Sequence, residues 1–167
     1  MQQAEEDQLS TFFANRGVDI DAHRAVFETI RAASVMVAVM EERALRPLGL
    51  THAGYRLLCE LWIKGPLELR DLAAFMIVSR PSIVGTVDTL EGNGLVERTR
   101  STLDRRLVSI VLTPAGLQLV ERADVAWHDC QVEVTSALST TEKRRLAALG
   151  RSVTQRALLL RDSTPPS

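Results

Sequence analysis

The chain has 167 residues, of which 46% are hydrophobic and 25% are charged, and its formal net charge is −1. This length and composition predict one globular protomer with a sizeable core and exclude a disordered protein. The acidic, polar N-terminus is unlike a signal peptide, and the apolar run at residues 32–40 is too short to cross a bilayer. We therefore expect a cytoplasmic protein without a membrane span, in which any nucleic-acid binding comes from local charge.

Charge is distributed unevenly along the chain. Residues 1–30 carry six acids and two bases, whereas residues 139–162 carry six bases and two acids. Opposite charges at the two ends can pair within one chain or between two chains. Pairing of this kind steers association more than it stabilises the product.

The first long helix is predicted over residues 21–46, after an N-terminal extension at residues 1–20 that we expect to be flexible. Its apolar residues lie on nearly every face, which predicts burial on several sides. They are Val26, Phe27, Ile30, Ala33, Val35, Met36, Val37, Val39, Met40 and Ala44. Pro47 and Gly49 end this helix, and Thr51 can cap the next one.

Three short helices are predicted between Thr51 and Gly94. The first has an inward face made of Tyr55, Leu57, Leu58, Leu61 and Trp62. The second covers residues 67–75, and the third covers residues 80–93 with Ser79 as its N-cap. The last two, joined by a tight turn, form a helix-turn-helix.

A β-hairpin follows this unit directly. Residues 96–100 and 107–112 are short alternating runs rich in β-branched residues, joined by a polar segment. Residues 98–106 hold four arginines and one aspartate. A cationic hairpin tip of this kind suits phosphates or a minor groove.

Two further helices complete the chain. Thr113 can cap a long helix that begins at Pro114 and runs to about residue 137. Ser139 and Glu142 have the spacing of a capping box, and the last helix then carries an apolar stripe. The stripe consists of Leu146, Leu149, Val153, Ala157 and Leu160. We expect residues 163–167 to be a disordered tail.

The spacing of the residues around the helix-turn-helix and hairpin resembles that of the MarR family, the multiple antibiotic resistance regulators. The matching positions are Leu50-Thr51, Ser82-Ile83, Gly85, Leu90-Glu91, Gly94-Leu95-Val96, Asp104-Arg105-Arg106, Thr113 and Gly116. The resemblance implies a mainly α fold with a small β-hairpin wing. It makes residues 50–113 a winged helix-turn-helix and residues 21–48 and 114–162 the dimerisation region. The excess of apolar surface on the first and last helices independently predicts a partner.

The function implied by this resemblance is that of a homodimeric transcriptional repressor on a pseudo-palindromic DNA site, modulated by a small-molecule effector. Ser79, Arg80, Ser82 and Thr86 would face the major groove from the third short helix. Arg105 and Arg106 would enter the minor groove at the wing tip, oriented by Asp104. Arg98 and Arg100 would touch the DNA backbone.

The sequence departs from the family pattern at two places. Ile77 stands at the bend of the helix-turn-helix, where a glycine is common, so we expect a turn without a left-handed residue or a longer loop. Positions that are often basic in the family are here uncharged, which predicts weak non-specific binding. They are Gly85, Thr89, Gly92 and Asn93.

A small aromatic or phenolic effector is the family's usual ligand class, and six residues could line a cleft for it. They are Met36, Met40, His52, Tyr55, Arg56 and Trp127. The same residues are equally compatible with an ordinary core.

Other functions are disfavoured by the residue pattern. Cys59, with Arg56 one turn away, could form a redox-sensing thiol, but a buried inert thiol is the favoured interpretation, and we expect Cys59 and Cys130 to stay reduced. Asp124 and His128 lie four apart without a third ligand, so we predict no metal and no cofactor. An enzyme would need a nucleophile beside a base, and this sequence shows no such pair at a workable spacing, so we do not expect an enzyme. A winged helix that binds proteins remains the alternative.

Overall fold

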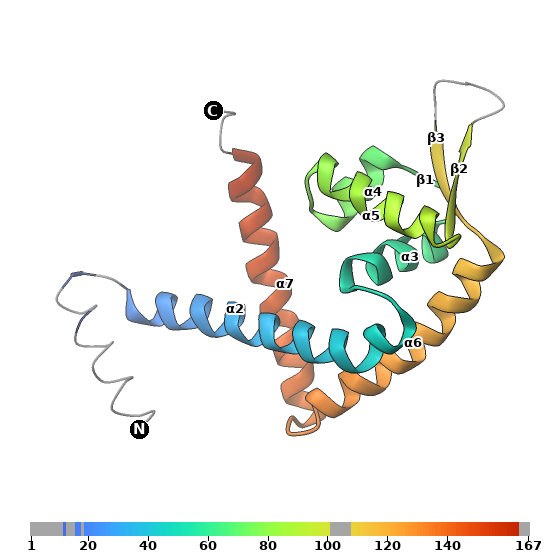
Figure 1. The fold of residues 1–167 in the computed structure, drawn as a ribbon. Coiled ribbons are helices and arrows are strands. Elements are labelled where there is room, and N and C mark those ends of the chain that lie inside the picture. Colours follow the sequence, from blue (N-terminus) through green and yellow to red (C-terminus); the bar gives the residue numbers. More distant parts are fainter. Residues whose placement is uncertain (1–11, 13–15, 18, 101–107, 164–167) are drawn as a thin grey trace. The chain divides into compact units, whose positions relative to one another are not determined.

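The computed structural model describes residues 12, 16–17, 19–100 and 108–163, which fall into two compact units divided after Trp127. Helices dominate the described residues, and three short strands form one antiparallel sheet (Figure 1). The predicted fold class, mainly α with a small β-hairpin wing, is confirmed. No helix in the described part of the chain is long and apolar enough to span a membrane.

Asp19 is the N-cap of helix α2 (Ile20–Met40), and its carboxylate accepts hydrogen bonds from the backbone N–H groups of Asp21 and Ala22. It continues without a break into a π-helical turn, η1 (Glu41–Leu45), and a 3₁₀ turn, η2 (Arg46–Leu48). Within its own unit α2 buries only Met40. Its exposed apolar side chains are Val26, Phe27, Ile30, Val35 and Val39. The burial predicted on several sides is therefore not provided by this unit.

Helix α3 (His52–Lys64) begins where the sequence predicts. The Thr51 hydroxyl accepts a hydrogen bond from the Gly54 N–H at 3.1 Å, and a Glu41 carboxylate oxygen accepts one from the His52 N–H at 2.8 Å. Most of the predicted inward face is buried, but Trp62 is 40% exposed. The prediction of an inward Trp62 was wrong because successive residues are about 100° apart on a helix. Its neighbour Leu61 occupies the core position instead.

The sheet has the strand order β1-β3-β2 and is antiparallel throughout. Strand β1 (Leu67–Glu68) pairs with β3 (Val108–Leu112), which pairs with β2 (Val96–Arg100). Residues 67–75 were predicted as a helix throughout, whereas the first two form β1 and helix α4 (Leu69–Met76) follows. A strand this short owes its conformation to its partner, because Leu67 lies opposite Ile110.

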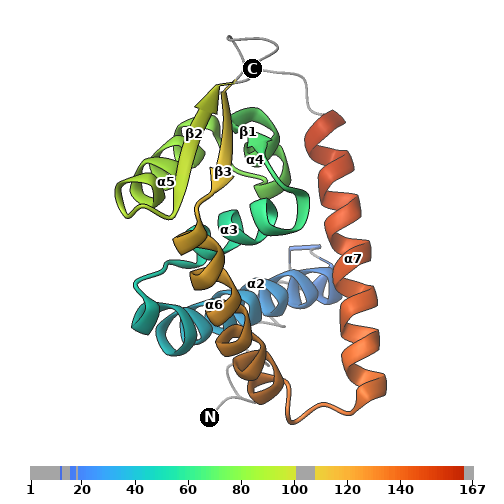
Figure 2. The ribbon, with the colours of Figure 1, turned by 90° about the vertical axis from the view of Figure 1, so that its right-hand side faces the viewer.

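The core of the first unit lies between α3, α4, helix α5 (Arg80–Gly92) and the sheet (Figure 2). Its largest fully buried side chains come from each of these elements, from η1 and from helix α6 (Pro114–Val134). They are Leu45, Leu57, Leu58, Leu72, Ile83, Val87, Val96, Ile110 and Val120. This shared core holds the helix-turn-helix and the base of the wing as one body.

Helix α6 (Pro114–Val134) begins in the first unit and ends in the second, three residues before the predicted end. Helix α7 (Thr140–Ser163) begins at the predicted capping box. The Ser139 N–H donates to Glu142 Oε2 at 2.8 Å, and the Glu142 N–H donates to the Ser139 hydroxyl at 3.3 Å. No described residue of α7 is buried. Its exposed apolar side chains include Leu146, Leu149, Val153 and Leu159.

Candidate nucleic-acid interface

Helix α5 presents an apolar face to the core, and one of its outward faces carries small, uncharged polar residues beside the exposed Asp88. Ile83, Val87 and Leu90 are buried, as their spacing predicts. Ser79 is the N-cap, and its hydroxyl accepts a hydrogen bond from the backbone N–H of Ser82 at 3.4 Å. Arg80 is exposed at the first residue of the helix. The outward face consists of Ser82, Gly85, Thr86 and Thr89.

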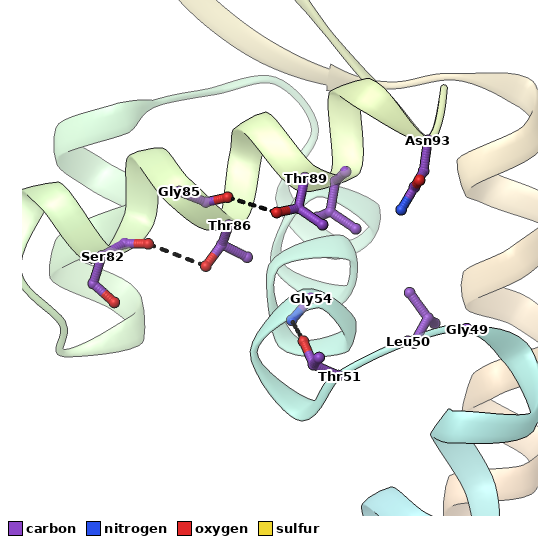
Figure 3. Close-up of a pocket in the computed structure, with 10 residues that line it drawn as sticks. Gly49, Leu50, Thr51, Gly54, Ser82, Gly85, Thr86, Thr89 and Asn93 are labelled. Carbon is purple, nitrogen blue, oxygen red and sulfur yellow. Dashed lines mark hydrogen bonds between the residues drawn. The ribbon is translucent and has the colours of Figure 1, made fainter.

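The two threonines on this face already use their hydroxyl protons. Thr86 Oγ1 donates to the Ser82 carbonyl at 3.1 Å, and Thr89 Oγ1 donates to the Gly85 carbonyl at 2.9 Å (Figure 3). In this arrangement each side chain offers oxygen lone pairs and a methyl group to an outside partner. The face therefore favours hydrogen-bond donors and apolar groups.

A cavity of about 310 Å³ lies between the start of α3 and this face of α5 (Figure 3). Gly85 contributes to its openness, because a Cβ added there would meet no atom within 4 Å. Sequence analysis did not predict this cavity. The available signal was the run of small residues on both sides. The lining residues are Gly49, Leu50, Thr51, Gly54, Ser82, Gly85, Thr86, Thr89, Leu90 and Asn93.

The bend of the helix-turn-helix differs from the prediction. Ile77 has φ 57° and ψ 44°, a left-handed conformation, and its side chain is 51% exposed. Its N–H and that of Val78 donate to carbonyls in the last turn of α4, at 3.2 and 3.1 Å. The turn thus has the left-handed backbone conformation that glycine adopts without strain, although the residue at this position is an isoleucine.

Arg98, on β2, makes contacts that sequence analysis did not predict. Its guanidinium forms an ion pair with Asp88 at 2.5 Å and a second ion pair with Glu91, both on α5. The backbone N–H of Arg98 also donates to Glu91 Oε1 at 3.2 Å. The hydrogen bond to Asp88 is the main cause of a raised Arg98 pKa. These contacts connect the wing to α5.

The tip of the wing lies outside the described residues. Asp104, Arg105 and Arg106 belong to it, so their roles stay predictions from the sequence. Arg100 is the last residue of β2, and its contact with the DNA backbone likewise stays a prediction.

The base of the wing joins α6 through residues that carried the family resemblance. Gly94 has φ 71°, and its carbonyl accepts a hydrogen bond from the Thr113 hydroxyl at 2.7 Å. The Thr113 hydroxyl accepts from the Gly116 N–H at 3.0 Å. A Cβ on Gly116 would stand 1.9 Å from the Leu95 carbonyl oxygen. These residues fix the direction of the wing, and Gly116 permits the close approach.

Part of the predicted effector cluster is brought together. The rings of His52 and Trp127 are stacked at 5.3 Å, and those of Tyr55 and Trp127 lie 5.2 Å apart. The Tyr55 hydroxyl donates to Asp124 Oδ1 at 2.9 Å. None of the six predicted residues lines the cavity described above. His52, Tyr55 and Trp127 thus form an aromatic cluster, and binding of an effector by the six residues stays a prediction. Met40 is buried, and Met36 and Arg56 are half-buried.

Burial shifts the pKa values of His52, Tyr55 and Cys59 away from their ordinary values. It lowers the pKa of His52, an effect that the nearby Arg56 reinforces and Glu41 opposes. It raises the pKa of Tyr55, which also hydrogen-bonds Cys59 and Asp124. Burial likewise raises the pKa of the Cys59 thiol. A protonated thiol is a poor nucleophile, which agrees with the inert interpretation of Cys59.

Metal binding finds no support among the described residues. No group of three or more histidine, cysteine, aspartate or glutamate side chains lies close enough together to hold an ion there. Cys59 and Cys130 are free thiols.

Comparison with known proteins identifies the family. The family model described as MarR matches residues 50–108, which extend from the α3 cap to the start of β3. The HTH-type transcriptional regulator YhbI of Bacillus subtilis (strain 168), itself uncharacterized, is 30% identical over 132 residues, or 79% of this chain and 86% of YhbI. The chain belongs to the MarR family.

Solved structures of MarR-type regulators share this fold. Sco3205 of Streptomyces coelicolor, a MarR family transcriptional regulator solved in complex with DNA, has a TM-score of 0.75 at 23% identity, covering 83% of this chain and 88% of Sco3205. CouR of Rhodococcus jostii RHA1, solved with p-coumaroyl-CoA, has a TM-score of 0.69 at 27% identity, covering 77% and 90%. The MarR-family winged helix-turn-helix is thus the fold of this chain, and the chain is a transcriptional regulator of that family.

Proposed function

We propose that this MarR-family regulator is a homodimeric repressor that binds a pseudo-palindromic operator through α5 and the wing of each protomer. The observation that carries the proposal is the exposed, uncharged polar face of α5, beside a wing whose residues 98–106 include four arginines. Small polar groups on a helix can approach base edges in a major groove, and arginines suit phosphates or a minor groove.

Each part of this interface has a distinct role. Thr86 and Thr89 offer acceptors and methyl groups, which fit the amino groups of adenine or cytosine and the methyl of thymine. Arg80 reaches a guanine edge or a phosphate, and Ser79 and Ser82 lie near the positive end of α5. Arg105 and Arg106, with Asp104, enter the minor groove, and Arg100 contacts the backbone.

Dimerisation is supported by the apolar surface that each unit leaves exposed. Val26, Phe27 and Ile30 of α2 are each more than half exposed, and so are Leu146 and Val153 of α7. A second copy of the chain can cover such surfaces. Two recognition helices about 34 Å apart would then match one turn of DNA.

Effector binding is assigned to the cluster of His52, Tyr55 and Trp127. CouR, a relative in fold, was solved with p-coumaroyl-CoA, whose acyl group is aromatic. An aromatic acid would have to separate these stacked rings to enter. It changes DNA affinity only if it binds the two conformations with different affinities.

The test of DNA binding is fluorescence anisotropy of the full chain on the duplex upstream of its own gene and on a shuffled duplex, over a salt series. We expect tighter binding to the upstream duplex and a steep salt dependence. Thr86→Val keeps the shape of the side chain and removes its oxygen, so it should weaken specific binding and leave shuffled-duplex binding unchanged. Equal, weak binding to both duplexes by a dimeric protein would contradict the proposal and favour a winged helix that binds proteins.

The effector assignment is tested by tryptophan fluorescence. Trp62→Phe leaves Trp127 as the only tryptophan, since the chain has two. We expect p-coumarate to change that emission in a saturable manner and to lower the anisotropy signal on DNA. A reporter driven by the upstream promoter should rise when the gene is deleted; a fall would make the protein an activator.

A further inference from the structure

The C-terminal half of α5 carries an unfavourable pair of charges for a DNA-binding helix. Asp88 and Glu91 are its acidic residues, and Arg80, at the other end, is its one basic residue. Carboxylates near a helix C-terminus oppose the helix dipole and repel a phosphate backbone. A recognition helix with this sequence needs a counter-charge beside its last two turns.

Arg98 supplies that counter-charge from the neighbouring strand. Its Nη2 lies 2.5 Å from Asp88 Oδ1, and its Nη1 contacts Glu91 Oε2. The Arg98 side chain is 30% exposed and that of Glu91 36%, so this ion pair is partly shielded from water, whereas the Asp88 side chain is 58% exposed. The Arg98 guanidinium thus forms ion pairs with both carboxylates.

The same contacts restrict the orientation of β2. A guanidinium is planar and rigid, and here two of its nitrogens meet two residues that are one helical turn apart. The Arg98 N–H adds a third contact, to Glu91 Oε1 at 3.2 Å. Arg98 lies two residues before the end of β2, which leads directly into residues 101–107. The contacts with α5 therefore restrict the direction of β2, in addition to the hydrogen bonds of Gly94, Thr113 and Gly116 at the base of the wing.

We propose that Arg98 is a positioning residue that fixes the wing against α5 and neutralises Asp88 and Glu91, instead of contacting the DNA backbone. This assignment rests on the proposed DNA-binding function and replaces the expectation that Arg98 touches a phosphate. A group already shared between two carboxylates is poorly placed to serve a third anion.

A double-mutant cycle on the full chain separates the two roles. Arg98→Gln is measured in the wild-type background and in the Asp88→Asn/Glu91→Gln background, by anisotropy on the upstream duplex over a salt series. We expect a loss of affinity of about tenfold in the first background, in the range of coupling between contacting residues, and little change in the second. A direct phosphate contact would give equal losses in both and lower the salt slope by about 0.9 in each. That result would overturn the proposal.

A second measurement requires no DNA. Hydrogen exchange should become faster at the β2 amides in Arg98→Gln, while the amides of Ile83 and Val87 in the α5 core stay protected. Arg98→Lys keeps the charge without the planar fork and should show an intermediate effect. Arg151→Gln, an exposed arginine on α7, is the control for loss of one positive charge. Unchanged β2 protection in Arg98→Gln would overturn the positioning role, even if the wild-type protein bound no duplex.

Discussion

The winged lobe, residues 52–112, and the terminal helices α2 and α7 differ in how far their apolar side chains are buried. The lobe buries side chains from each of its helices and from β2 and β3, including Leu58, Leu72, Ile83 and Ile110. Helix α2 buries Met40 alone, and no described residue of α7 is buried. The lobe is therefore stabilised by its own packing, whereas most of the described apolar side chains of α2 and α7 are exposed.

The largest expected effect comes from breaking the lobe at the base of the wing. Gly116→Ala places a Cβ 1.9 Å from the Leu95 carbonyl oxygen, so backbone atoms must move. We expect a loss of about 3 kcal/mol in the free energy of unfolding, measured by urea denaturation. Gly85→Ala is the matched control, because its Cβ meets nothing within 4 Å. It should stabilise α5 by about 1 kcal/mol. Equal destabilisation by both substitutions would contradict the close approach at Gly116.

A charge in the apolar stripe of α7 should break the dimer and leave the lobe folded. Val153→Glu puts a carboxylate on a side chain that is 54% exposed in the single chain. We expect monomers in light scattering and about 100-fold weaker operator binding, equivalent to about 2.7 kcal/mol. Gln155→Glu, on the opposite side of α7, is the control. A dimer that survives Val153→Glu would move the interface away from this stripe.

Relief of backbone strain at the helix-turn-helix bend should increase the stability of the lobe. Ile77 is left-handed and 51% exposed, so Ile77→Gly loses little buried surface and removes a steric penalty. We expect the free energy of unfolding, measured by thermal denaturation, to rise by about 1 kcal/mol. The steric penalty for a non-glycine residue in this conformation exceeds the cost of the greater conformational entropy that glycine has in the unfolded chain. Val78→Gly, at the next residue, should destabilise. A loss at both positions would mean that the Ile77 side chain stabilises the lobe.

The smallest effect concerns the junction where α3 meets α6. Burial lowers the pKa of His52 in the folded protein, so the unfolded state binds more protons as the pH falls below the ordinary histidine value near 6.5. Stability from this group is present above that pH and is lost as the pH falls through 6.5 toward the folded pKa. The melting temperature should drop more between pH 8 and pH 5.5 in the wild type than in His52→Gln. An equal fall of melting temperature with pH in the wild type and in His52→Gln would contradict the lowered pKa of His52.

Local sequence signals predicted where several helices begin and end. Ser79 and Thr51 are helix caps, Gly94 adopts a left-handed conformation, and the capping box at Ser139 forms as expected. These features depend on neighbouring residues alone. Strand β1 was missed because its conformation depends on pairing with a segment some 40 residues away.

The site was predicted less completely, for the same reason. The outward face of α5 follows from helical spacing, but the partners of Arg98 are seven and ten residues away and are brought close only by the packing of β2 on α5. Ile77 shows the opposite limit. The hydrogen bonds that end α4 hold Ile77 in a left-handed conformation that an isoleucine disfavours, so the residue type predicted the wrong turn.

The π-helical turn η1 gives the connection between α2 and α3 a fixed length. Its first residue, Glu41, caps the first amide of α3, and a π-turn contains about one residue more than an α-turn. Deleting one residue between positions 41 and 45 would replace the wide turn by an ordinary α-turn and shorten the connection between Glu41 and His52 by one residue. The Glu41 carboxylate would then no longer reach His52. Homologues that preserve this hydrogen bond should therefore accept substitutions in the turn far more readily than insertions or deletions.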